Sequence, residues 1–178
     1  MACAMGIEIA ELLGGERTRR PLQSTRLIIL STDGEEPGLL GAGSFAREHR
    51  DELLAVKTYV LNFDSIYRTR DLTALTRDRN GTMPLSRSMG EDFHRVASQL
   101  GRSIKMSPIP IFAGATDAAR FAEVGVEALS VVGLPIPPIR EEIGFHTSGD
   151  TVENIEPEAV EACLEIAQRY ILETDRAA

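Results

Sequence analysis

Three groups of polar residues each follow an apolar run of the kind that forms a buried strand. They are residues 33–36 (DGEE), 62–64 (NFD) and 145–147 (FHT). Neighbouring carboxylates repel each other unless a cation or solvent compensates, and carboxylate oxygens together with one imidazole suit Zn²⁺ or a similar divalent ion. These residue types, placed just past strands, therefore indicate metal chemistry.

The adjacent Glu35 and Glu36 also allow a division of labour. One carboxylate can bind metal while the other faces the cleft and accepts a proton from a metal-activated water. Taken alone, a Glu-Glu pair is more common as a solvated acidic loop, and a single His146 is more common as a structural or surface histidine. The order of the three groups and their flanking residues favour the metal interpretation.

The elements that must position these groups alternate between strand and helix. Apolar, β-branched runs predict buried strands at residues 25–31, 55–63 and 128–132 and an edge strand at 72–76. Helical spacing of apolar residues predicts helices in the opening segment up to Gly14, at 38–49, 86–100 and 118–124, and from Pro157 onward. We therefore expect an α/β fold in three layers, a mostly parallel mixed sheet with helices on both faces. Sites in such sheets gather at the carboxyl ends of strands.

Composition limits the domain number and the class of partner. The chain has 178 residues, of which 43% are hydrophobic and 26% charged, which predicts one globular domain over residues 1–178. The net charge of −8 argues against a nucleic-acid partner. No apolar run approaches the ~20 residues that cross a bilayer, so we expect no membrane partner and a cytoplasmic location. Cys3 and Cys163 lack CxxC spacing, which argues against a disulfide framework or a cysteine zinc site.

Four motifs in sequence order resemble the signatures of M28 metallo-aminopeptidases, members of the co-catalytic zinc exopeptidases. Residues 31–42 (STDGEEPGLLGA) resemble "DGEE-x-GLLGS", and residues 62–64 resemble the later "N-x-D". Residues 114–128 (GATDAARFAEVGVEA) resemble "G-[ST]-D-A…F…G-[IV]-P-A", and residues 145–155 (FHTSGDTVENI) resemble "YHT-x-x-DT-x-[DE]-NI". The resemblance covers nearly the whole chain, and its ending favours M28 over the related M20 and M42 types.

The resemblance implies a role for each residue of the proposed metal site. Glu35 would be the general base, and Glu36 and His146 would be ligands of one zinc ion. Asp64 would be a ligand of a second zinc ion in the pair that the family carries. The implied activity is hydrolysis of N-terminal peptide bonds by a metal-activated water.

The resemblance also implies a substrate and its contacts. A peptide or amino-acid amide would be held by its free amine, with Thr116, Asp117 and Phe145 close to it. Phe145 stands where the family often carries a tyrosine, whose hydroxyl can stabilise the oxyanion. Because one such donor is worth about 2.7–4 kcal/mol, its loss predicts slower peptide cleavage.

The family pattern contains further ligands, an "H-x-D" pair and a bridging Asp in "D-[ND]-x-[SA]-G". The bridging Asp precedes a helix that residues 6–12 resemble, so it is expected a few residues before Met1. The chain is therefore expected to be truncated at its N-terminus, with weak zinc binding and little activity. Residues 49–51 (HRD) match "H-x-D" literally, but they follow the Glu-Glu motif, and we interpret them as a coincidence.

Two alternatives to an aminopeptidase stay open. The missing ligands and Phe145 favour a non-catalytic, M28-like binding or scaffold domain. The retained acids argue against it, since mutually repelling carboxylates serve no purpose around an absent metal. Glutaminyl-cyclase-like acyl transfer on the same fold is the other alternative, and assembly into a homo-oligomer is also left open.

Overall fold

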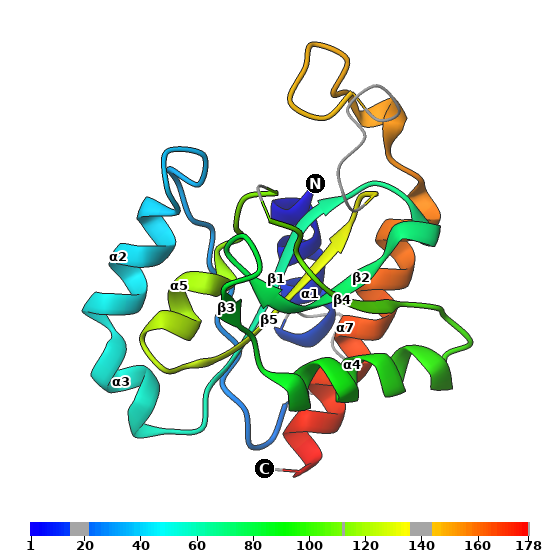
Figure 1. Cartoon of the computed structure of the whole chain (residues 1–178). Helices are drawn as coiled ribbons and strands as arrows, with labels where there is room; N and C mark the ends of the chain where they lie inside the picture. Colours follow the sequence, from blue (N-terminus) through cyan, green and yellow to red (C-terminus); the bar gives the residue numbers. More distant parts are fainter. Residues whose placement is uncertain (15–21, 112, 136–143, 178) are drawn as a thin grey trace.

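The computed structural model describes residues 1–14, 22–111, 113–135 and 144–177, and it consists of a sheet with helices on both faces (Figure 1). The strands are β1 (Tyr59–Ile66), β2 (Thr73–Asp78), β3 (Met83–Pro84), β4 (Lys105–Pro108) and β5 (Glu127–Gly133). The helices are α1 (Ala2–Gly14), α2 (Leu40–Glu48), α3 (Arg50–Ala55), α4 (Arg87–Gln99), α5 (Ala118–Glu123) and α7 (Pro157–Ala177), with single 3-10 turns η1 (Thr69–Asp71) and η2 (Val152–Asn154). In the part of the chain that these ranges cover, no helix is long and apolar enough to cross a membrane.

The sheet is mixed, and its order is β1-β5-β2-β3, with β4 also beside β2. β1 and β5 are parallel, as are β2 and β4, whereas β2 runs antiparallel to both β5 and β3. β2 therefore lies inside the sheet, and the predicted edge strand at 72–76 is wrong. Its alternating pattern suggested an edge strand, but even the polar Thr73 is buried, and its hydroxyl donates to the carbonyl of Asp71 at 2.9 Å.

Two apolar cores, one on each face of the sheet, confirm the predicted α/β layering. On one face α4 and α7 pack together, and the rings of Phe93 and Tyr170 lie 5.7 Å apart. On the other face α5 packs on β5 and β1 around Phe121, and α2 packs against α5, with Ala46 in the same core (Figure 1). α1 extends the first layer by packing Ile9 against α7.

The helix predictions hold where apolar spacing was long and regular. α4 begins after Ser86, whose hydroxyl accepts a hydrogen bond from the backbone N–H of Met89, and α7 begins at the predicted Pro157. One helix was not predicted: α3 occupies residues 50–55, so β1 begins only at Tyr59. Its first turn carries acidic residues, which suits a helix start.

The predicted buried strand at 25–31 does not form. Ile28, Ile29 and Leu30 are 48%, 44% and 41% exposed, and no strand among the described residues is hydrogen-bonded to this segment. A β-branched run signals the propensity to pair, but a strand exists only where a second strand supplies the partner groups. The segment is instead held at its beginning, where Asp175 of α7 accepts hydrogen bonds from the backbone N–H groups of residues 23–25.

Candidate functional site

A tight backbone turn holds Glu35 and Glu36 in front of α2. The N–H of Leu39 donates to the carbonyl of Glu35 at 2.7 Å, and the N–H of Gly41 donates to the carbonyl of Asp33 at 3.0 Å. Gly41 is required here, because a Cβ at this position would lie 2.7 Å from the backbone of Asp33. The turn therefore fixes the backbone from which both glutamates project.

Asp64 lies at the carboxyl end of β1, beside an irregularity in the strand. The pairing with β5 shifts between Asp64 and Ile66, and the intervening Ser65 has a φ of 50°. The Ser65 hydroxyl donates to Asp64 Oδ1 at 2.8 Å. Bulges of this kind redirect a side chain at the end of a strand, and this one ends regular pairing at Asp64.

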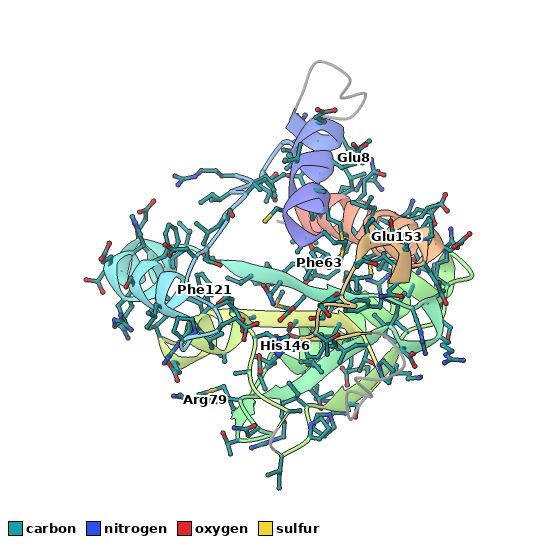
Figure 2. All side chains as sticks on the ribbon, turned by 90° about the horizontal axis from the view of Figure 1, so that it is seen from above. Glu8, Phe63, Arg79, Phe121, His146 and Glu153 are labelled. Carbon is teal, nitrogen blue, oxygen red and sulfur yellow. The ribbon has the colours of Figure 1, made fainter. Side chains whose placement is uncertain are left out.

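His146 lies on the loop between β5 and α7. Its Nε2 is 2.9 Å from Glu36 Oε1, and its ring stacks on Phe145 with the centroids 4.0 Å apart. Viewed from above, His146 lies near the centre of the fold (Figure 2). The structure thus brings the predicted pair Glu36 and His146 into contact, although they are distant in sequence.

The carboxylates at this end of the sheet repel one another. Burial, followed by the charges of Asp64 and Glu36, raises the pKa of Glu35 to about 7. Burial also raises the pKa of Asp64, with Asp117 and Asp78 adding to the effect. A carboxyl group with a pKa near 7 is suited to take up and return protons at neutral pH.

Thr116 is committed to a buried network around Asp78, a residue that the sequence reasoning missed. The Thr116 hydroxyl donates to Asp78 Oδ2 at 2.6 Å, its N–H donates to Asp78 Oδ1 at 3.0 Å, and the same hydroxyl lies 2.9 Å from Ser130 Oγ. The only signal for Asp78 was a carboxylate at the end of an apolar strand. Thr116 is 3% exposed, so its side chain belongs to the buried hydrogen-bond network next to the site.

Asp117 stands at the N-cap position of α5 without capping it. Its side chain makes no cap hydrogen bond. Thr32 instead donates to Asp117 Oδ2, while Oδ1 is buried with no hydrogen-bond partner among the described residues. A buried carboxylate oxygen without a donor is costly, and a water, proton or cation would satisfy it.

A cavity of about 1620 Å³ joins the predicted site residues. Its walls include Glu35, Glu36, Asp64 and His146, together with the first residues of α1. Among the predicted substrate-binding residues, Thr116 and Phe145 line this cavity and Asp117 does not. Apart from Asp117, the predicted residues therefore face one common space.

The described residues supply part of a metal site. Within them, no three side chains of His, Cys, Asp or Glu lie close enough together to hold an ion. Glu36 and His146 provide a carboxylate and an imidazole at contact distance, and these donors suit zinc. The pair therefore fits a divalent ion in its donor chemistry, and one more protein ligand would complete the three that catalytic zinc usually has.

Three solved structures of similar fold are aminopeptidases. They are a zinc aminopeptidase from Bacillus subtilis (20% identity, TM-score 0.63, covering 81% of this chain and 34% of that one), the LapA aminopeptidase from Legionella pneumophila (18%, 0.63, 80% and 37%) and a TET aminopeptidase from a marine sediment archaeon of the Thaumarchaeota (19%, 0.54, 83% and 41%). No curated protein sequence matches the chain significantly. These identities establish a shared fold, and the chain spans only 34% to 41% of the lengths of these three proteins.

Family membership rests on a match to the sequence itself. The profile of Peptidase family M28 matches residues 1–171, which is nearly the whole chain. The matched region contains both loops that meet at the Glu36–His146 contact. The chain belongs to peptidase family M28.

Proposed function

We propose that the chain is the catalytic part of a zinc-dependent aminopeptidase, an exopeptidase that hydrolyses N-terminal peptide bonds. The observation that carries the proposal is the 2.9 Å contact between Glu36 and His146 in the cavity that Glu35 also lines. Membership of the M28 family and the aminopeptidases of similar fold support it.

Glu35 acts as the general base in this proposal. With a pKa of about 7, its carboxyl group is partly ionised at neutral pH. It accepts a proton from the attacking water and returns it to the leaving amine. Bound zinc would polarise the scissile carbonyl and make the water more acidic. Glu36 and His146 would hold one ion, and Asp64 would hold a second.

The acidic character of the site suits a substrate with a free amine. Glu35, Asp64 and Asp117 lie close enough for their charges to affect one another, which makes the region attractive to an ammonium group. The Phe145 ring lines the same cavity and offers an apolar wall to a side chain of the substrate. A peptide or amino-acid amide with an unblocked N-terminus is therefore the proposed substrate.

One observation favours a second candidate function, a non-catalytic binding domain. Among the described residues only two ligands stand at contact distance, fewer than catalytic zinc uses. A domain with such a site can bind a cation or a peptide without hydrolysing it. The two candidates differ in whether bound zinc produces turnover.

The test measures hydrolysis of leucine p-nitroanilide by the chain, first in EDTA and then with added zinc. We expect slow, zinc-dependent hydrolysis that falls at least about 100-fold in Glu35→Gln, because the general base is lost. The exposed Glu48→Gln on α2 is the matched control and keeps the rate. The N-acetylated substrate is expected to resist cleavage.

Three outcomes separate the candidates. Hydrolysis that depends on neither zinc nor Glu35 overturns the proposed mechanism. Zinc binding without turnover favours the binding domain. The absence of both zinc binding and turnover overturns both candidates.

A further inference from the structure

Tyr67 connects the end of β1 to the segment that carries His146. Its backbone N–H donates to the carbonyl of Gly133 in β5 at 3.0 Å, and its carbonyl accepts from the N–H of Glu156 at 2.8 Å. Its side chain is 7% exposed, and its hydroxyl donates to Asp150 Oδ1 at 2.7 Å. Tyr67 is thus fixed to the sheet and linked twice to the polypeptide that leads from His146 to α7.

The loop around His146 is organised by its own hydrogen bonds. The N–H of Thr147 donates to the carbonyl of Gly144 at 2.9 Å, the N–H of Asp150 donates to the carbonyl of Thr147 at 3.1 Å, and the Asn154 amide donates to the carbonyl of Gly149 at 2.6 Å. In Figure 1 this loop projects beyond the strand ends. Because these bonds tie the loop's described residues to one another, the contacts that those residues make with the body help to set where His146 lies.

Besides the Glu36–His146 contact, Tyr67 makes two of those contacts. The Phe145 ring meets the Tyr67 ring edge to face, with the centroids 6.3 Å apart at 89°. Phe145 in turn stacks on His146 at 4.0 Å and 19°. One side chain at the end of β1 therefore supports the loop at Asp150 through its hydroxyl and at Phe145 through its ring.

We propose that Tyr67 is a positioning residue, which places the His146 imidazole beside Glu36 through the hydroxyl bond to Asp150 and the ring contact with Phe145. The consequence for zinc rests on the proposed function, since it takes His146 as a ligand. The positioning itself does not. Removing a group that orients a metal ligand without binding the metal itself typically weakens metal affinity by about 10–100-fold.

The first test compares Tyr67→Phe with Tyr170→Phe. Both tyrosines are 7% exposed, and each variant removes one hydroxyl and keeps the ring, but Tyr170 lies in the core on the α4 and α7 face. The readout is the NMR spectrum of the three histidine imidazoles in zinc-free protein, with the His146 signal assigned from its loss in His146→Gln. We expect Tyr67→Phe to shift the His146 signal alone and Tyr170→Phe to leave it in place.

The second test measures zinc affinity by competition with a chelating dye. We expect Tyr67→Phe to bind zinc about tenfold more weakly than the wild type, and Tyr170→Phe to bind it equally. Because the imidazole spectra are recorded without metal, they still test the positioning role if the chain fails to bind zinc. Failure of the proposed function is thereby distinguished from failure of this inference.

A third variant covers the case in which Tyr67→Phe does not fold. Asp150 is exposed, so Asp150→Ala removes the acceptor without touching the core. It is expected to shift the same His146 signal. An unchanged His146 signal in folded Tyr67→Phe, or in Asp150→Ala where Tyr67→Phe does not fold, overturns the proposal.

Discussion

Two carboxylates whose charges affect each other, the buried Asp78 and the half-buried Asp64, have different surroundings. Asp78 is fully buried and accepts hydrogen bonds from the backbone N–H groups of Arg79 and Thr116 and from the Thr116 hydroxyl. Asp64 accepts one hydrogen bond among the described residues, from its neighbour Ser65.

The difference separates a structural carboxylate from one available for chemistry. Burial raises the pKa of both residues, but around Asp78 three fixed donors oppose that effect. Around Asp64 and Glu35, neighbouring carboxylates raise the pKa further. A carboxylate surrounded by donors stabilises the fold, whereas carboxylates surrounded by like charges need a proton or a cation.

The largest expected effect comes from removing the structural carboxylate. Asp78→Ala is expected to lower the free energy of unfolding by about 3 kcal/mol, because two backbone N–H groups and the Thr116 hydroxyl lose their buried acceptor. Asp64→Asn is the comparison variant, and we expect a change below about 1 kcal/mol, since it also removes repulsion. Urea unfolding at pH 7 in EDTA measures both. Equal losses in the two variants would contradict the distinction.

A smaller loss is expected when the network loses one donor. Thr116→Val keeps the shape of the side chain but removes the hydroxyl between Asp78 and Ser130. We expect the free energy of unfolding to fall by about 1.5 kcal/mol. The exposed Thr151→Val controls for the substitution itself and should stay within about 0.5 kcal/mol of the wild type in the same urea titration.

The smallest effect concerns the pH dependence that Glu35 imposes. Its pKa is raised from 4.5 to about 7, so the folded protein holds this proton more tightly than the unfolded chain does. The stabilisation is complete below pH 4.5 and is lost as the pH rises through about 7. In EDTA, Glu35→Gln should therefore be more stable than the wild type at pH 8 by about 1 kcal/mol, a figure reduced for partial solvent exposure.

That advantage should shrink toward pH 5, where the wild-type carboxyl group is largely protonated. Unfolding free energies of Glu35→Gln, Glu48→Gln and the wild type at pH 5, 6, 7 and 8 measure it. A constant difference across this range would show that Glu35 does not titrate as the structure indicates.

The sequence predicted correctly those elements whose residue pattern also shows which face packs against the core. The helices at 86–100 and from Pro157 were found because apolar spacing encodes both the helical period and the buried face. The run at 25–31 carries strand propensity but no information about which strand lies beside it, and that prediction failed. Strand propensity alone therefore predicts a strand even where, among the described residues, no second strand lies beside the segment to pair with it.

The same distinction holds for the site. The contact of Glu36 with His146 was predictable because a family resemblance places both residues in loops that close on one cleft. Asp78 and Tyr67 were missed, since each depends on a partner far along the chain, Thr116 for the first and Asp150 for the second. Such pairs leave no local pattern in a single sequence.

The central claim is that Glu36 and His146 together hold a divalent ion. Calorimetric titration of zinc into the wild type, Glu36→Gln, His146→Gln and the double variant tests it, with the exposed His94→Gln on α4 as control. The account predicts that each single variant loses nearly as much zinc affinity as the double variant, and that His94→Gln loses none. Wild-type zinc binding no tighter than that of the double variant would contradict it.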